Sequence, residues 1–344
     1  MSAVALLLGI FGLALLMVVH EAGHHLVARS FGLRVLRFSI GFGPALFRYQ
    51  PRGSDTIYQV ALIPFLAYVH VAGMNPFEEQ DPNDRGSYGN ASLPVRIATI
   101  VAGPLANYLF ASVLFFAALL VGGEEITSPA PIVEVLPGGP AATADMRTGD
   151  RVVAIDGRPI ATFEEMRAVV LASPGKQLAV DVDRGGGRVT LRITPTAGGE
   201  SGGGRILVQG RSERVPVTVG RALTRSVIAP AIVVERLVVG LVRIILQKER
   251  AELAGPVGIV KIAASAAGRG IDQYLEFLGV LSAYLGGFNL LPVPGLDGGR
   301  LVFLLTEAVT RRRPDARVET GIHALGLVML VALMIVVTVF DWRR

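Results

Sequence analysis

Long runs of apolar residues set the architecture that this sequence predicts. About 20 consecutive apolar residues are enough to cross the hydrocarbon core of a bilayer as a helix. The segments that are long enough to consider lie at residues 2–28, 94–121, 222–246, 274–309 and 321–340. The first of them carries no charged side chain over residues 2–19. We therefore expect an integral membrane protein, with the lipid bilayer as one of its partners.

Two stretches between these segments have the pattern of strands. Residues 35–73 are rich in β-branched and aromatic residues and are broken by Gly and Pro, as at Gly41 and Pro44. Strands beside a membrane need partners for their backbone groups, so we expect a β-hairpin packed against the helices. Residues 129–196 alternate apolar and polar positions between regular turns, which predicts a compact β-rich domain.

The expected strands of this domain are short, and a capping signal marks its helix. The strands cover residues 133–135, 152–155, 178–182 and 189–193. Thr162 and Glu165 form an S/T-x-x-E capping box, which predicts a helix that ends near Ser173. The glycine-rich residues 198–204 are typical of a flexible linker. We therefore expect a linker over residues 197–221.

The motif HEAGH, from His20 to His24, lies at the end of the first apolar run. Two histidines four residues apart share one face of a helix, where both can bind one Zn²⁺, and Glu21 is placed to deprotonate an attacking water. The motif also arises by chance in soluble helices. Ionisable groups within a membrane span are costly enough to imply a function, so we favour a zinc hydrolase acting on peptide bonds. His25 faces another side and is expected at the membrane interface.

Composition narrows the class of protein. Of the 344 residues, 51% are hydrophobic and 18% are charged, and the mean hydropathy of +0.52 is too high for an ordinary soluble protein. The formal net charge is +5, but the basic residues are not interleaved with aromatic ones, so no nucleic acid is expected as a partner. The chain has no cysteine, which excludes disulfides and cysteine zinc ligands. The first segment lacks a basic leader and is expected to be a retained anchor.

Four motifs together resemble the bacterial site-2 proteases, which are intramembrane zinc metalloproteases, and specifically the regulator-of-sigma-E type with a PDZ domain. These motifs are HEAGH, GFGP at residues 41–44, AGPLAN at 102–107 and NLLPVPGLDGG at 289–299. The resemblance implies that Asp297 is the third zinc ligand beside His20 and His24, with Glu21 as the catalytic base. Two histidines and one carboxylate leave the fourth tetrahedral position open, as a catalytic zinc requires. The resemblance also implies supporting or substrate-binding roles for Asn107, Asn289, Pro292 and Pro294.

Alternatives remain for parts of this assignment. Residues 289–299 alone could be a Pro/Gly-broken turn between two apolar helices. Asn107 and Asn289 could hold the peptide or the oxyanion, or could only make interhelical hydrogen bonds. In the strand after GFGP, relatives tend to have a Gly pair where this chain has Leu66 and Ala67, so we expect an altered substrate preference.

The β-rich stretch resembles a PDZ domain at residues 133–142 and 149–157. Such a domain captures a peptide or a chain end by strand addition. With this resemblance, we expect a zinc endopeptidase that cleaves a single-pass membrane protein, either an anti-sigma factor or a signal-peptide remnant. The hairpin around residues 57–71 would hold the unwound substrate as an added strand.

Two other classes of function were weighed. A non-proteolytic PDZ scaffold would have no use for the base Glu21. An ion transporter usually shows paired repeats of spans, and this sequence shows no internal repeat.

The arginines after the first segment set the expected orientation in the bacterial inner membrane. Arg29, Arg34 and Arg37 put the histidine end on the cytoplasmic side and the PDZ domain outside. If residues 222–246 crossed the membrane, Asp297 would lie on the wrong side, so we expect an amphipathic helix on the outer surface there. The expected fold is a polytopic α-helical membrane protein. Four transmembrane helices, in residues 1–123 and 247–344, carry a membrane-associated β-hairpin and the inserted PDZ domain.

Overall fold

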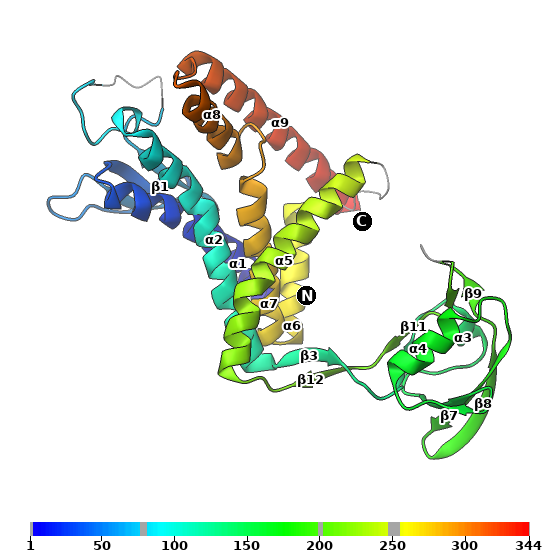
Figure 1. The fold of residues 1–344 in the computed structure, drawn as a ribbon. Coiled ribbons are helices and arrows are strands. Elements are labelled where there is room, and N and C mark those ends of the chain that lie inside the picture. Colours follow the sequence, from blue (N-terminus) through cyan, green and yellow to red (C-terminus); the bar gives the residue numbers. More distant parts are fainter. Residues whose placement is uncertain (1–2, 76–80, 199–201, 247–254, 344) are drawn as a thin grey trace. The chain divides into compact units, whose positions relative to one another are not determined.

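The structure is a computed structural model that describes residues 3–75, 81–198, 202–246 and 255–343 (Figure 1). The chain divides into two compact units. One unit comprises Met1–Gly122 with Val217–Arg344 and holds the long helices and one sheet. The other, Gly123–Pro216, is rich in short strands.

Three helices in the described part of the chain are long and apolar enough to cross a membrane. They are Leu6–Ser30, Leu93–Gly122 and Arg317–Val339. The corresponding full helices are α1 (Ala3–Ser30), α2 (Leu93–Gly122) and α9 (Ala316–Arg343). A helix satisfies its own backbone hydrogen bonds, which is what a lipid environment demands. The protein is therefore membrane-embedded, and the predicted count of four spans stays a prediction.

The apolar segment over residues 274–309 forms two helices. These are α7 (Ile271–Asn289) and α8 (Asp297–Thr310), and the break between them lies within the Pro/Gly-rich motif of residues 289–299. Pro292 and Pro294 cannot donate backbone hydrogen bonds, and Gly295 has a φ of +92°, which favours glycine. The break makes Asp297 the first residue of α8.

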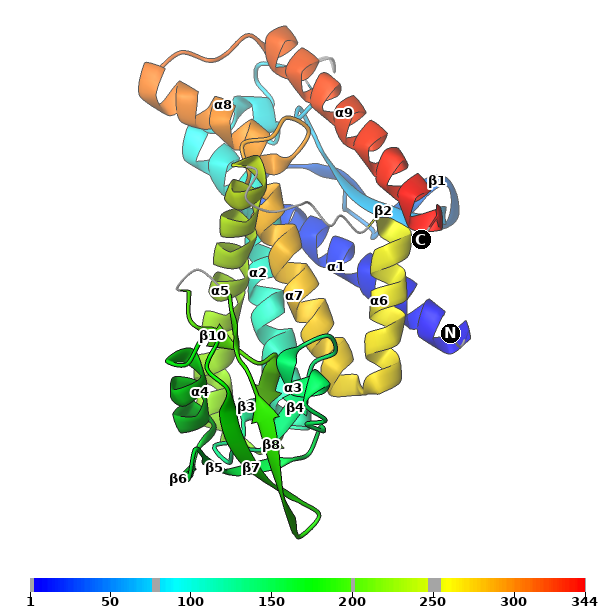
Figure 2. The same ribbon diagram turned by 90° about the vertical axis from the view of Figure 1, so that its right-hand side faces the viewer.

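Two more long helices of this unit lie in the described part of the chain. α5 (Val219–Ile245) packs against α2 and α7 and buries Ala222, Ser226 and Pro230. α6 (Pro256–Arg269), which the sequence did not predict, is joined to α7 at Gly270 and runs antiparallel beside it (Figure 2).

α6 affects the expected placement of residues 222–246 on the outer surface. A chain that enters the bilayer through α5 and returns through α6 would start α7 on the same side as before. The argument that excluded a crossing by residues 222–246 did not take α6 into account. The surface placement itself stays a prediction, and residues 247–254 lie outside the described part.

The region of the expected hairpin forms a bent sheet. β1 (Val35–Tyr49) and β2 (Ile57–Val71) are long antiparallel strands, and the start of β1 pairs with both ends of β2. Residues 37–40 pair with 57–60 on one side and with 67–70 on the other. β1 turns at Gly41, which has a φ of +90° and where a Cβ would lie 2.5 Å from the Ile63 carbonyl oxygen. Residues 67–71 form one edge of this sheet and pair, among the described strands, with β1 alone.

A hydrophobic cluster fixes the sheet to the helices. It joins the end of α1, both strands, the start of α2 and α8 through Ala28, Leu33, Val35, Val71, Tyr88, Ile100 and Leu304. The sheet edge therefore lies beside the helices that carry the candidate site.

The β-rich unit contains the expected strands and four more after them. Its elements are β3 (Glu124–Thr127), β4 (Val133–Val135), α3 (Pro140–Thr143), β5 (Arg151–Ile155), β6 (Arg158–Pro159), α4 (Phe163–Leu171), β7 (Leu178–Arg184), β8 (Gly187–Ile193), β9 (Thr196–Ala197), β10 (Gly204–Arg205), β11 (Val208–Gly210) and β12 (Ser212–Val215). The largest sheet has the order β6-β5-β7-β8. The capping box at Thr162 and Glu165 is present and starts α4.

The expected linker over residues 197–221 is wrong for residues 204–215. β11 pairs with β4 and β12 pairs with β3, so this part of the chain closes the unit. Ile206 is buried in the core of the unit, and Val208 packs against that core. A glycine-rich run therefore precedes strands here, and the unit extends beyond the expected residues 129–196.

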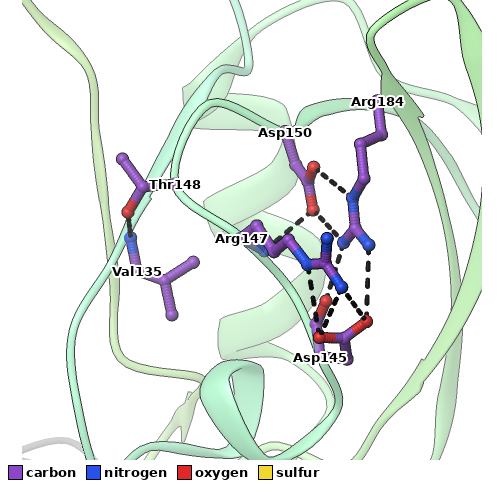
Figure 3. Close-up of polar contacts among 6 residues, drawn as sticks. All are labelled: Val135, Asp145, Arg147, Thr148, Asp150 and Arg184. Carbon is purple, nitrogen blue, oxygen red and sulfur yellow. Dashed lines mark hydrogen bonds and ion pairs between the residues drawn. The ribbon is translucent and has the colours of Figure 1, made fainter.

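A buried ion pair connects two parts of this unit (Figure 3). Arg184 donates to the Asp150 carboxylate at 2.9 Å and 2.7 Å, and the Arg147 amide donates to it at 2.9 Å. Asp150 is only 2% exposed. Burial would raise the pKa of Asp150, but the hydrogen bonds from Arg184 and Arg147 hold it below its usual value. The ionised carboxylate thereby ties the turn before β5 to the end of β7.

Candidate metal centre

His20, His24 and Asp297 meet although they are far apart in the sequence. Their candidate ligand atoms all lie within 4.8 Å of one another. Asp297 Oδ2 is 3.1 Å from His20 Nε2 and 3.3 Å from His24 Nε2, and the two Nε2 atoms are 3.3 Å apart. Both histidines are buried. The expected ligand set is thus gathered at one point inside the helices.

Glycines create the space for this cluster. At Gly23 a Cβ would lie 2.3 Å from the Ala102 carbonyl oxygen, so α1 and α2 approach closely only without side chains there. At Gly103 a Cβ would lie 2.2 Å from His24 Nε2. The AGPLAN motif therefore supplies the room that the His24 ring occupies.

The atoms in the cluster fit a metal ion. His24 Nδ1 is 2.7 Å from the Thr99 carbonyl oxygen, which can only accept, so the proton lies on Nδ1 and Nε2 presents a lone pair. This lone pair faces Asp297 Oδ2, a buried oxygen with no hydrogen-bond partner among the described residues. Two lone pairs that face each other repel unless a cation lies between them. Two imidazole nitrogens and one carboxylate oxygen suit Zn²⁺ with one position left open.

Asn107 lies against His20 and is completely buried. Its Nδ2 atom is 3.3 Å from His20 Nδ1, and its Oδ1 atom has no partner among the described residues. If His20 Nε2 binds metal, Nδ1 carries the proton, and two donors would face each other. Exchanging the amide oxygen and nitrogen, which are assigned from hydrogen bonding, lets Oδ1 accept from Nδ1–H. Asn107 then orients His20 as the Thr99 carbonyl orients His24.

Glu21 lies between the metal centre and the sheet. Its carboxylate interacts electrostatically with both histidines and Asp297, and the backbone amide of Val69 lies close enough to interact with it as well. The base is thereby held next to the edge strand, residues 67–71.

The other expected site residues lie outside the ligand cluster. Asn289 ends α7 half-buried. Pro292 is exposed, and Pro294 is half-buried against α9, where a Cβ at Gly326 would lie 2.2 Å from the Pro294 carbonyl oxygen. Both prolines shape the loop that leads to Asp297.

Two histidines have contacts that the sequence did not predict. His25 is buried against the sheet, because Nε2 is 3.1 Å from the Tyr58 hydroxyl and the ring meets Phe38 edge-on. His323 on α9 accepts a hydrogen bond at Nδ1 from the Gly295 amide at 3.0 Å. The only signal for His323 was a single histidine within an apolar segment.

Acceptor atoms gathered inside membrane helices, next to a glutamate, are the arrangement of a membrane-embedded metallohydrolase. Comparison with known proteins identifies the family. The family model described as peptidase family M50 matches residues 8–333, and the chain belongs to this family. This is the site-2 protease family that the sequence motifs resemble, so the protein is a zinc-dependent metalloprotease.

Several bacterial relatives are similar over almost their whole length, and each is named "Putative zinc metalloprotease". The relative from Rhizobium meliloti is 33% identical over 95% of this chain and 93% of its own. The one from Nostoc sp. is 32% identical over 93% and 91%, and the one from Clostridium perfringens is 30% identical over 95% and 95%.

Proposed function

We propose that this protein is an intramembrane endopeptidase that cleaves single-pass membrane proteins. His20, His24 and Asp297 hold the zinc, and Glu21 is the general base. The observation that carries this proposal is the position of the ligand cluster: two of its members lie within the candidate membrane span Leu6–Ser30.

The chemistry follows from how the site residues are held. Zinc, when bound, supplies a Lewis acid that polarises the scissile carbonyl and makes water more acidic. The Thr99 carbonyl and the Asn107 amide keep the two imidazoles oriented with Nε2 toward the metal. Glu21 takes one proton from the attacking water and later gives it to the leaving amine, so the carboxylate is regenerated.

The substrate lies along the edge strand, residues 67–71. A membrane helix hides its own peptide bonds, so the substrate has to unwind locally before it is cut. An unwound segment gains main-chain hydrogen bonds by pairing with a sheet edge. The contact between the Val69 amide and Glu21 supports this path, because a strand added here passes next to the base. Anti-sigma factors and signal-peptide remnants are the substrate types that the family resemblance suggests.

The β-rich unit acts as a PDZ domain that captures a peptide or chain end. A cavity of about 680 Å³ lies between α4 and residues 203–210. Its lining includes the apolar side chains of Met166, Val170 and Ile206. A strand that faces a helix across an apolar groove is the arrangement that takes an added peptide strand.

The decisive test compares Glu21→Gln with the matched variant Glu276→Gln, which makes the same change at an exposed position of α7. Each purified protein is given a single-pass substrate, and cleavage and zinc content are measured. Glu21→Gln should keep its zinc and lose at least a hundredfold in rate, because the ligands remain while the base is gone. Glu276→Gln should match the wild type. Normal turnover by Glu21→Gln would refute the mechanism.

The protein lies in the bacterial inner membrane, with the metal centre toward the cytoplasm and the β-rich unit outside. Because the chain has no cysteine, single cysteines at Arg188 and Arg312, both exposed, report on the two sides. A membrane-impermeant thiol reagent should label intact cells at residue 188 and not at residue 312. Labelling at residue 312 and not at residue 188 would contradict this topology.

A further inference from the structure

A second cavity, of about 390 Å³, lies beside the edge of the membrane-associated sheet. Residues 69–71 and 73–75 form one wall, and Tyr88, the start of α2, α8 and α9 form the others. Its charged lining residues are Arg96, Arg300, Glu307, Arg313 and Glu319.

Two residues that line the cavity also contact residues of the metal centre or of the loop that leads to it. Val69 lines it, and the backbone amide of Val69 lies next to the Glu21 carboxylate. His323 lines it as well, and Nδ1 of His323 accepts from the amide of Gly295, two residues before Asp297. A molecule in this cavity therefore touches residues that position both the base and the third ligand.

His323 presents an unsatisfied donor. Nδ1 accepts the Gly295 amide proton, so the proton of the neutral ring lies on Nε2. That nitrogen is buried and has no hydrogen-bond partner among the described residues. Leaving a buried N–H group unpaired is unfavourable, so an acceptor from another molecule fits this place.

Two further donors line the same cavity. Burial raises the pKa of the Tyr88 phenol, so it stays protonated. The half-buried guanidinium of Arg300, one turn after Asp297, interacts electrostatically with Glu319 across the cavity and forms no closer ion pair with a described residue. In contrast, Arg96 donates to Glu307 at 3.0 Å, and Arg313 lies 3.4 Å from the same carboxylate.

The charges of the cavity fit a peptide main chain better than an anion. Three arginines and two glutamates give a formal net charge of only +1. Glu319 faces the same space and has no ion pair with a described residue, so the cavity offers an acceptor as well as donors. A peptide group matches both, because it has one C=O and one N–H.

We propose that this cavity binds the main chain of the extended substrate next to the scissile bond. His323 Nε2–H and Arg300 donate to its carbonyl oxygens, and Glu319 accepts from an amide. An added strand pairs with the sheet along one edge only, and its other edge needs partners where water is scarce. Residues of α8 and α9 supply these partners. This assignment rests on the proposed function and names the second side of its substrate site.

Two substitutions of His323 separate its two hydrogen bonds. In His323→Asn, the amide oxygen can replace Nδ1 toward Gly295, while nothing replaces Nε2 in the cavity. In His323→Gln, the amide nitrogen can replace Nε2, while the acceptor for Gly295 is lost. We expect His323→Asn to raise KM about tenfold, the value of one hydrogen bond, with unchanged zinc content. His323→Gln should keep KM and lose zinc more readily.

Arg300→Gln is compared with Arg312→Gln, which removes the same charge at an exposed position outside the cavity. Only Arg300→Gln should raise KM. His323→Asn and Arg300→Gln could both keep the KM of the wild type, while anionic lipid vesicles change the activity of the wild type but not that of Arg300→Gln. The cavity would then be a lipid site, and the proposal would be wrong.

Crosslinking tests the bound conformation directly. The chain has no cysteine, so Thr320→Cys places a single thiol in the cavity, and Val318→Cys places one on the same helix outside it. Both are made in the Glu21→Gln background, with substrates that carry single cysteines at successive positions. An extended substrate should crosslink to residue 320 at every second position, and residue 318 should give little.

Crosslinks at every third or fourth position, or equal yields from both thiols, would overturn the proposal. Failure of the proposed function would look different, because the wild-type protein would then leave the uncrosslinked substrate uncut.

Discussion

Replacing Asn107 by Leu should weaken zinc binding by about 10–100-fold. The side chain is completely buried and its amide lies 3.3 Å from His20 Nδ1. Leu has a similar size and removes the amide that lies against His20 Nδ1 and can accept from Nδ1–H. Loss of such a partner typically costs 10–100-fold in metal affinity, which is about 1.4–2.7 kcal/mol. The cost of leaving one buried N–H unpaired, about 1–3 kcal/mol, is of the same size.

The assay is zinc retention against a series of chelators of graded affinity, in detergent, with activity measured in parallel. Asn107→Asp keeps an acceptor toward Nδ1–H and should stay close to the wild type. Ser282→Ala is the matched control. The Ser282 hydroxyl donates to the Asn107 backbone carbonyl at 2.9 Å, so this substitution removes a hydrogen bond to the same residue without changing its side-chain amide. It should retain zinc.

Two results would contradict this reasoning. Wild-type zinc affinity in Asn107→Leu would mean that the amide does not orient His20. Equal loss in Asn107→Asp and Asn107→Leu would mean that Asn107 donates to Nδ1, and His20 would then not ligate through Nε2.

Three other predictions follow from contacts in the structure. Asp297→Ala should lose zinc and activity together, with Asp297→Asn nearly as poor, and full zinc occupancy by elemental analysis would place the third ligand elsewhere. Gly103→Ala should also lose zinc, because the new Cβ would lie 2.2 Å from His24 Nε2, whereas Gly268→Ala on α6 meets open space and should have no effect. Asp150→Asn should destabilise the fragment 123–216 by about 1–3 kcal/mol at pH 7, because Arg184 loses its buried partner. Since the pKa of Asp150 is lowered in the folded state, its contribution is complete above the unfolded pKa of about 3.9 and disappears as the pH falls through the folded value. Urea titrations of both proteins between pH 7 and pH 2 should therefore converge, and a constant difference would contradict the ion-pair argument.

The sequence predicted features that depend on local spacing. The histidines of HEAGH share a helix face because they are four residues apart, and the apolar run marks their helix as a span. Strand and helix positions within residues 129–196 follow from alternation and from the capping box at Thr162 and Glu165. These patterns are set by neighbours in the chain, so they are visible without the fold.

The meeting of Asp297 with His20 and His24 was expected only from the family resemblance, and several other features that depend on distant contacts were missed. α6 was missed because the segment 256–269 is short, contains many small residues and has no long apolar run. The strands over residues 204–215 follow a glycine-rich run, and only their pairing with β3 and β4 reveals that they belong to the unit. The contact of His25 with Tyr58 was missed because the two residues are distant in the sequence. No periodicity encodes such contacts.

The three candidate ligands are not held equally firmly. His20 and His24 lie on α1, and each has a second hydrogen bond to α2, through Asn107 and Thr99. Asp297 follows a loop that α9 contacts closely, since Gly326 lies against Pro294 and His323 bonds to Gly295. In the apolar stretch of α9 only 6% of the residues are buried, against 28% in α1 and in α2.

Helices in lipid are held together by close packing and hydrogen bonds, since the surrounding lipid is as apolar as their side chains. A helix with so few buried residues is therefore weakly held, and a shift of α9 would reach the metal centre through Gly295 and Asp297 before it reached either histidine. Substrate that binds beside His323 would act on the same loop. Asp297, the candidate third ligand, is thus the residue of the centre whose position substrate binding and helix packing can change most directly.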